Sequence, residues 1–384
     1  MNETNLGRYN IFRVNIEYYF IFIITFLLSV IGIIMISSAS IAVGERYFSD
    51  PYWFVRRQII WWVISLILFI IFSKINYHFY SKISIFFILI AIGLLAIVLI
   101  PSFSIEIGGS RRWLNLLFFN IQPSEVAKLA VIIFLCDTLN KKYRKRSSIK
   151  NILFPAFVVL VIVTILIFLE PDLSTVIIIW AVAFTVLFVG NVKFQHIFSL
   201  GIIGIAVIVG YMMMEEYRRE RIFAFIDKTT GGTGVNFQVN QSLIALGSGS
   251  ITGVGLGNSV QKYSYLPEAH TDFIFAILGE EFGLVGTTIV LLLFFLFTLF
   301  GIRVCLKTEE FFGRILAAGM TALIAIQVII NVAVVIGLLP VTGLTLPFIS
   351  FGGSSLLICM VSVGILLNIS RQNITVVKNN TREA

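Results

Sequence analysis

Residues 259–283 read SVQKYSYLPEAHTDFIFAILGEEFG, and they join a polar loop to a strongly apolar segment. The polar part ends at Asp272, and the apolar segment that follows still contains Glu280 and Glu281. Each ionised side chain at the depth of a lipid bilayer costs about 2.5–3.5 kcal/mol. A chain that keeps carboxylates in such a place needs them for a partner, a polar cavity or a chemical task.

A helix that begins at Asp272 would gather its small and acidic side chains on one stripe, because successive residues turn by about 100°. The stripe consists of Asp272, Ala276, Gly279, Glu280 and Gly283. We expect it to line a water-filled cleft, with the carboxylate of Asp272 at the mouth. Glu281 falls on the opposite face of the helix, and its sequence position predicts no role.

The composition predicts a membrane protein. Hydrophobic residues make up 58% of the 384 residues and charged residues only 12%, which is far from the average of soluble domains. Apolar runs long enough to cross a bilayer recur along the whole chain. They predict about ten transmembrane helices, near 16–38, 58–74, 83–101, 121–139, 152–170, 174–190, 198–214, 272–303, 314–338 and 348–369. We therefore expect an all-α polytopic membrane protein in which residues 1–384 form a single domain.

Basic residues predict how the chain is oriented. The run KKYRKR at 141–146 marks a cytoplasmic connection, since Lys and Arg accumulate on that side. Both termini are then cytoplasmic, and residues 215–271 form a large extracytoplasmic loop between the seventh and eighth helices. Asp272 consequently faces the outside. The net charge of +8 follows from this topology, and no soluble basic domain is present to bind nucleic acid.

The sequence gives no sign of a disulfide framework or of a metal site made by cysteine and histidine. The three cysteines have no paired spacing, and the histidines are scattered along the chain. We expect His270 to be a surface or hydrogen-bonded histidine rather than a catalyst.

Glu125 and Lys128 are three residues apart and therefore share one face of a predicted helix. We expect a structural ion pair in which each charge offsets the burial cost of the other, so that removal of one partner harms folding. Glu280 has two open interpretations: it lines the cavity or tunes Asp272, or it is paired in the core.

Eight motifs together resemble the SEDS family (shape, elongation, division, sporulation), in the family's order and over nearly the whole chain. They are RRWLN at 111–115, QPSEVAKLA at 122–130, EPDLSTVI at 170–177, YRRERI at 217–222, QSLIALGSG at 241–249, GVGLGNSVQK at 253–262, YLPEAHTDFIFAILGEEFG at 265–283 and LPFISFGGSSL at 346–356. The motifs are more similar to the division branch, FtsW, than to the elongation branch, RodA, and a sporulation paralogue is a further alternative. Ser264 stands where division-type members often have Glu, which puts a second carboxylate there in doubt.

The resemblance implies a peptidoglycan glycosyltransferase that polymerises lipid II, a disaccharide-pentapeptide carried on undecaprenyl diphosphate. Asp272 would be the general base that activates the acceptor hydroxyl. Cations would hold the diphosphate leaving group, although simple anchoring to lipid head groups is the alternative role for each arginine. The candidates for substrate binding are Lys262, Arg218, Arg219, Arg221, Arg111, Arg112, Glu280 and Ser354. Ser354 has a second interpretation, since it lies in GGSS at 352–355, where small residues permit close helix packing.

A divalent cation such as Mg²⁺ could bridge the diphosphate and Asp272, and no organic cofactor is expected. The resemblance implies a class B penicillin-binding protein as the transpeptidase partner, together with other membrane proteins of the division machinery. The expected location is the bacterial inner membrane at the division septum. Two other functions stay open, namely a lipid II flippase or transporter and a non-catalytic division scaffold.

Overall fold

The computed structural model describes residues 16–107, 110–116, 119–145, 150–214, 219, 235–263 and 265–383. Its long helices are α1 (Ile16–Ala39), α3 (Trp53–Lys74), α4 (His78–Val98), α5 (Pro123–Lys145), α6 (Lys150–Leu169), α7 (Leu173–Val189), α8 (Phe194–Met214), α11 (Ile274–Lys307), α12 (Phe311–Val335) and α13 (Gly353–Glu383). Each of them coincides with one of the predicted apolar runs, so the predicted polytopic helical fold is confirmed. Two short helices, α2 (Ile41–Phe48) and α10 (Val235–Ser248), lie in the connections.

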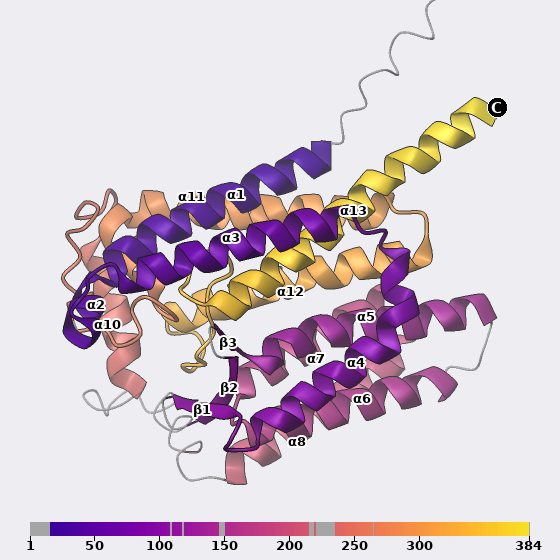
Figure 1. The fold of residues 1–384 in the computed structure, drawn as a ribbon, viewed down its shortest axis with the longest axis horizontal. Helices are drawn as coiled ribbons and strands as arrows, with labels where there is room; N and C mark the ends of the chain where they lie inside the picture. Colours follow the sequence, from indigo (N-terminus) through magenta and orange to yellow (C-terminus); the bar gives the residue numbers. More distant parts are fainter. Residues whose placement is uncertain are drawn as a thin grey trace, which may run out of the picture.

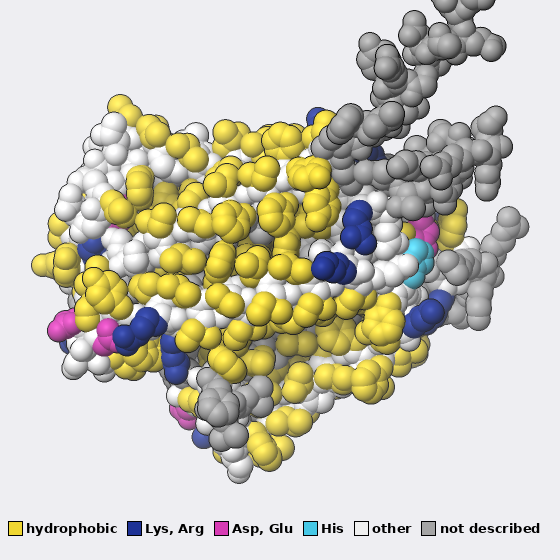
Figure 2. Space-filling view, turned by 45° about the horizontal axis from the view of Figure 1, so that its top comes forward, with side chains coloured by type: hydrophobic (Ala, Val, Ile, Leu, Met, Phe, Trp, Pro, Cys, Tyr) yellow, Lys and Arg dark blue, Asp and Glu magenta, His cyan; other side chains and the backbone are white. Residues whose placement is uncertain are grey.

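The composition of the helices fits a membrane environment. In the described part of the chain, seven helices are long and apolar enough to cross a membrane: α1, α3, α4, α8, α11, α12 and α13. The apolar parts of α6 and α7 are shorter, and α5 contains charged residues. Figure 2 shows hydrophobic side chains over most of one face of the molecule, with charged side chains mainly towards its two ends.

The helices form two groups (Figure 1). The first contains α1, α3, α11, α12 and α13, and the second contains α4 to α8. Helix α12 packs against both α5 and α7 and so joins the groups. Residue 16 of α1 and the end of α13 lie at the same end of the molecule, while α2, α10 and the strands lie at the other (Figure 1). Which end faces the cytoplasm stays a prediction.

A small antiparallel sheet follows α4. Strand β2 (Ser110–Leu116) lies between β1 (Ser104–Ile107) and β3 (Phe119–Ile121). These strands were not predicted from the sequence, although Ser104–Ile107 alternates polar and apolar residues, which is the pattern of a half-buried strand. The sheet brings Arg112 of β2 into contact with the connection between α6 and α7.

Helix α11 is discontinuous, whereas the sequence predicted one uninterrupted helix from 272. It begins at Ile274, and Gly283 interrupts it with a φ of +63°, in the region that only glycine adopts without strain. The shorter first half, 274–282, is therefore a separate unit directly after Asp272.

The segment from 249 to 255 replaces the hydrogen bonds that the break removes. The main-chain N–H groups of Leu284 and Val285 donate to the carbonyls of Ser250 and Ile251, and those of Val254 and Gly255 donate to the carbonyls of Glu280 and Glu281, at 3.0–3.1 Å. An added Cβ on Gly253 would overlap the carbonyl of Glu281, so this crossing requires glycine. A broken helix inside a membrane needs such replacement, because lipid cannot pair the exposed main-chain groups.

Candidate functional site

Asp272 is partly exposed and lies two residues before α11, at the end of the molecule that carries α2 and α10. The connection between α12 and α13 packs beside it. One carboxylate oxygen of Asp272, Oδ2, lies 3.6 Å from the position that a Cβ on Gly343 would occupy. The end of the same connection also contacts the segment before α11, because the N–H of Phe351 donates to the carbonyl of His270 at 3.0 Å. Two of the motifs, 265–283 and 346–356, therefore form one site around the Asp272 carboxylate.

His270 is buried beside two aromatic rings, with ring centroids 4.5 Å from Phe54 and 5.8 Å from Phe351. Its Nδ1 has no hydrogen-bond partner, and burial lowers the pKa of the imidazole below its usual value. The ring was expected at the surface or in a hydrogen bond, and this prediction was wrong. Its neighbour Phe54 belongs to α3, which is far away in the sequence, so the local sequence could not reveal this contact. The packing indicates a neutral ring that supports the Asp272 segment.

The predicted acidic stripe does not line a cleft. Ala276, Gly279, Glu280 and Gly283 are buried, since α10 and the segment that follows it pack over this face of α11. The carboxylate of Glu280 accepts hydrogen bonds from the Ser259 hydroxyl and from the N–H groups of Val260, at 3.0 Å, and Gln261, at 3.4 Å. Of the two interpretations of Glu280, the structure shows the core one: the carboxylate closes the turn that precedes Lys262.

Lys262 forms a buried ion pair with Glu281, with 3.1 Å between Nζ and Oε1 and side-chain exposures of 1% and 0%. The Ser38 hydroxyl on α1 donates to the same carboxylate at 2.5 Å. This pairing gives Glu281 the role that its sequence position did not predict. Contact between Lys262 and a substrate stays a prediction, and it would require the ammonium to leave a closed ion pair.

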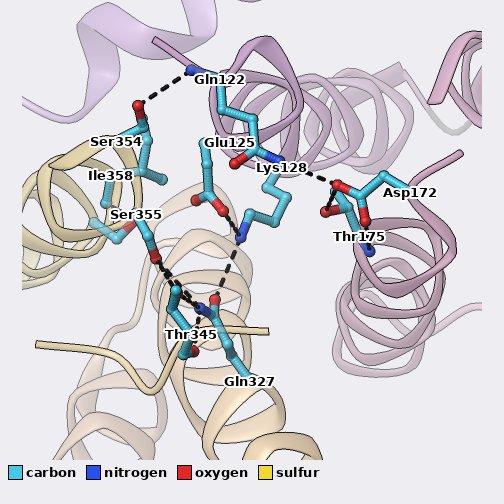
Figure 3. A network of polar contacts seen from close by, with 11 residues as sticks. Gln122, Glu125, Lys128, Asp172, Thr175, Gln327, Thr345, Ser354, Ser355 and Ile358 are labelled. Atoms are coloured by element: carbon cyan, nitrogen blue, oxygen red, sulfur yellow. Dashed lines mark hydrogen bonds and ion pairs between the residues drawn. The ribbon is translucent and has the colours of Figure 1, made fainter. Parts of the chain in front are cut away.

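The predicted ion pair between Glu125 and Lys128 is present. Nζ of Lys128 lies 2.8 Å from Oε1 of Glu125, and the side chains are 1% and 7% exposed. The ammonium also donates to Oε1 of Gln327 on α12 at 3.3 Å, so the pair connects α5 to α12 (Figure 3). The second carboxylate oxygen of Glu125 is buried without a hydrogen-bond partner.

Ser354, a candidate for substrate binding, is buried at the start of α13. Its hydroxyl accepts from the N–H of Gln122 at 3.1 Å, and the Gln122 amide donates to Asp172 at 3.1 Å (Figure 3). Asp172 in turn caps α7 by accepting from the N–H of Thr175 at 3.1 Å. In this arrangement the Ser354 hydroxyl joins α13 to the segment before α5, and the Gln122 side chain joins that segment to α7. A contact between Ser354 and substrate stays a prediction.

The two arginines of β2 have different surroundings. Arg111 is exposed and pairs with Glu106 at 3.3 Å. Arg112 donates from Nε to the main-chain carbonyl of Glu170 at 2.9 Å and from an amino group to the carbonyl of Pro171. These carbonyls follow the C-terminus of α6, where helix carbonyls lack partners and a cation is favoured. Arg219 is partly buried, and Arg218 and Arg221 lie outside the described residues.

Sequence reasoning missed Glu170, which is fully buried just after α6 with no hydrogen-bond partner on either carboxylate oxygen. Burial and, to a smaller extent, the charge of Asp172 raise the pKa of its carboxyl from 4.5 to about 9, and the charge of Arg112 opposes the shift. Glu170 is therefore neutral at pH 7. Two sequence signals were available: the acidic residue directly follows an apolar run, and it opens the motif EPDLSTVI at 170–177.

Within the described residues, no group of three or more His, Cys, Asp or Glu side chains is arranged to hold a metal ion. Asp272 offers a single carboxylate near Gly343. Mg²⁺ is commonly held by one or two carboxylates together with substrate phosphates, so the residues present fit a cation that arrives with a diphosphate.

Comparison with known proteins gives consistent matches over almost the entire chain. The model of the cell cycle protein family that contains FtsW, RodA and SpoVE matches residues 18–375. Stage V sporulation protein E of Bacillus subtilis is 41% identical over 349 residues, covering 91% of this chain and 95% of that protein. A probable peptidoglycan glycosyltransferase FtsW of Geobacter sulfurreducens is 37% identical over 343 residues, covering 89% and 92%.

Solved structures share the fold. A chain from a peptidoglycan synthase complex, described as coordinating polymerisation and crosslinking, superposes with a TM-score of 0.72 at 25% identity, covering 93% of this chain and 97% of that one. The rod shape determining protein RodA of Thermus thermophilus superposes with a TM-score of 0.67 at 24% identity, covering 92% and 96%.

Replacing Lys128 by Met should reduce the thermal stability of the purified protein strongly, because Glu125 would become an uncompensated buried charge, at a cost of about 3–5 kcal/mol. The double variant Lys128→Met with Glu125→Gln should recover most of the loss, since no charge is left. Thermal unfolding in detergent measures both. Arg111→Met is the matched control, because this arginine pairs with Glu106 and both side chains are exposed, at 46% and 55%. A double variant as unstable as the single one would contradict the ion-pair interpretation.

Glu170→Gln should stabilise the protein, and the gain should grow with pH. The folded-state pKa of about 9 exceeds the ordinary 4.5, so the folded protein binds more protons than the unfolded one and loses stability as pH rises between these values. The variant should therefore exceed the native protein in Tm by several degrees at pH 8, and the difference should shrink towards pH 5. Glu106→Gln, at an exposed site, is the control. A Tm difference that stays constant with pH would contradict the buried neutral acid.

Proposed function

Because this chain belongs to the SEDS family of FtsW, RodA and SpoVE proteins, we propose that it is a peptidoglycan glycosyltransferase that joins lipid II units into glycan strands. Relatives named as probable peptidoglycan glycosyltransferases, at 37% identity over most of both chains, support the transferase activity. The observation that carries the assignment to a site is the position of Asp272, a partly exposed carboxylate that directly precedes a membrane-type helix.

Asp272 acts as the general base in this proposal. It takes the proton from the 4-hydroxyl of the acceptor sugar as that oxygen forms a bond to the anomeric carbon of the donor. The bond from the anomeric carbon to the diphosphate oxygen breaks, and the undecaprenyl diphosphate leaves as an anion. One carboxylate suffices, whereas glycoside hydrolysis uses two because its leaving group needs a proton. The boundary position lets the base reach the sugar while the lipid remains in the bilayer.

The leaving diphosphate needs cations, and Arg112 is the described residue that suits this task best. Two of its N–H groups are fixed by the carbonyls that follow α6, which orients the guanidinium. Its other N–H groups form the planar fork that binds phosphate oxygens. Arg111 on the same strand is a second candidate and is exposed. A divalent cation between the diphosphate and Asp272 would supply further charge stabilisation.

The proposal includes a class B penicillin-binding protein as partner. The support is the similarity to a chain of a peptidoglycan synthase complex that couples polymerisation to crosslinking, at 25% identity over nearly the whole chain. Other membrane proteins of the division machinery belong to the same expectation.

A septal role in cell division is the finer proposal, and the sporulation role is its alternative. Relatives of both branches match over similar lengths, at 37% identity for FtsW and 41% for stage V sporulation protein E. Depletion of this protein in its own host separates the two. Filamentous cells without septa would support division, and normal growth with a failure to form spores would contradict it.

One observation favours the flippase alternative, namely the interruption of α11 at Gly283 next to the buried charges of Glu281 and Lys262. Transporters use such discontinuous helices at their substrate sites. In this protein, however, the segment 249–255 closes the break and the charges are paired with each other. The break therefore supports a fixed half-helix more strongly than a transport site.

Asp272→Asn should abolish polymerisation of lipid II by the purified full-length protein with its partner, because loss of a general base costs about 10²–10⁴-fold. Electrophoresis of the glycan product measures the rate, and thermal unfolding verifies the fold. Glu268→Gln is the matched control, an exposed carboxylate in the same loop. A normal rate of polymerisation by Asp272→Asn would contradict the mechanism. Movement of lipid II across vesicle membranes without polymer formation would favour the flippase.

A further inference from the structure

Asn331 on α12 is fully buried and bonds to two main-chain carbonyls at once. Its Nδ2 donates to the carbonyl of Asp272 at 2.8 Å and to the carbonyl of Leu344 at 2.6 Å. Asp272 precedes α11, and Leu344 belongs to the connection between α12 and α13. One side-chain amide thus ties these two segments to a helix of the bundle interior.

Chemistry fixes the orientation of this amide. Both partners are carbonyl oxygens, which only accept hydrogen bonds, so the amino group must face them. The other atom, Oδ1, is then buried without a hydrogen-bond partner. An unsatisfied buried acceptor costs about 1–3 kcal/mol. The double contact is therefore kept at an energetic cost to the fold.

Gln327 lies one helical turn before Asn331 on the same face of α12. Its Nε2 donates to the carbonyl of Thr345 at 3.0 Å, and its Oε1 accepts from Lys128 at 3.3 Å (Figure 3). The two amides of α12 thus hold successive carbonyls, of Leu344 and Thr345. They also connect the Asp272 segment to the buried ion pair of α5.

The backbone before α11 is clamped at three successive residues. The carbonyl of His270 accepts from the N–H of Phe351 at 3.0 Å, and that of Thr271 accepts from the Ser350 hydroxyl at 2.6 Å. The carbonyl of Asp272 accepts from Asn331. Ser350 and Phe351 belong to a connection, whereas Asn331 belongs to a long buried helix, so it is the rigid reference among the three clamps.

We propose that Asn331 is a positioning residue, which holds the backbone of Asp272 and the 342–345 segment in register so that the carboxylate meets the acceptor hydroxyl. The inference rests on the proposed function of Asp272. It requires no contact between Asn331 and substrate. Displacement of a catalytic group by about 1 Å can cost 10²-fold in rate, so loss of this clamp should lower kcat and leave KM nearly unchanged.

The test compares Asn331→Asp and Asn331→Ser with a matched control, Asn368→Asp. The aspartate is isosteric and places an oxygen against both carbonyls, and the serine is too short to bridge them. Asn368 is also fully buried, and its Nδ2 donates to the carbonyl of Ser73 at 2.9 Å, at the end of α3 that is remote from α2. The full chain with its partner is assayed for kcat and KM with lipid II, and for Tm.

Both Asn331 variants should lose about 10–100-fold in kcat with KM within about twofold, while Asn368→Asp, at a similar loss of Tm, keeps its kcat. Unchanged kcat, a change in KM alone, or an equal kcat loss in Asn368→Asp would overturn the inference. So would failure of both Asn331 variants to fold while Asn368→Asp folds, since Asn331 would then hold the fold and not the base.

Asp272→Asn, assayed in parallel, separates this inference from the proposed function. If Asp272→Asn is inactive and the Asn331 variants polymerise normally, only the positioning role fails. If Asp272→Asn polymerises normally, the proposed function fails and the positioning role with it.

Discussion

A lipid bilayer offers no water to unpaired main-chain groups, and the interruption of α11 is possible only because another segment pairs them. Four hydrogen bonds exchanged between 250–255 and 280–285 stand in for the helical ones lost at Gly283. They also fix the half-helix 274–282 against the loop that precedes it. Asp272 directly precedes this short unit, so the closed break fixes the helix on one side of the site, while bonds from Phe351, Ser350 and Asn331 hold the backbone of 270–272.

The buried polar side chains around Asp272 mainly serve the fold. Glu281 is paired with Lys262 and Glu125 with Lys128, and the carboxylate of Glu280 closes a turn of the preceding loop. Loss of one partner of such a pair is costly, and hydrogen bonds from Ser38 of α1 to Glu281 and from Lys128 to Gln327 of α12 connect these charges to elements that are distant in sequence. These paired charges therefore serve the fold, and in the proposed mechanism a sugar substrate approaches from the side on which Asp272 is partly exposed.

The sequence predicted those structural features that depend on the spacing of residues close together in the chain. Apolar runs located the long helices, and the three-residue separation of Glu125 and Lys128 predicted their contact. Periodicity could not reveal what covers a helix face, so the small and acidic stripe of α11 was taken for the wall of a cleft. The partners of Glu281 come from α1 and from the loop before α11, and such contacts depend on the packing of the whole fold.

The cations expected to hold the diphosphate also show the difference between local sequence patterns and contacts that depend on the whole fold. Lys262 was favoured because it stands in the same motif as Asp272, yet its ammonium is closed off by Glu281 and Ser38. Arg112 comes from a strand that the sequence did not predict, and two of its five N–H groups bind main-chain carbonyls. The side edge of the guanidinium is thereby anchored, and its end keeps the fork that suits phosphate oxygens. An anchored guanidinium loses little freedom on binding, and for this reason the proposed mechanism assigns the departing diphosphate to β2 rather than to the Lys262 motif.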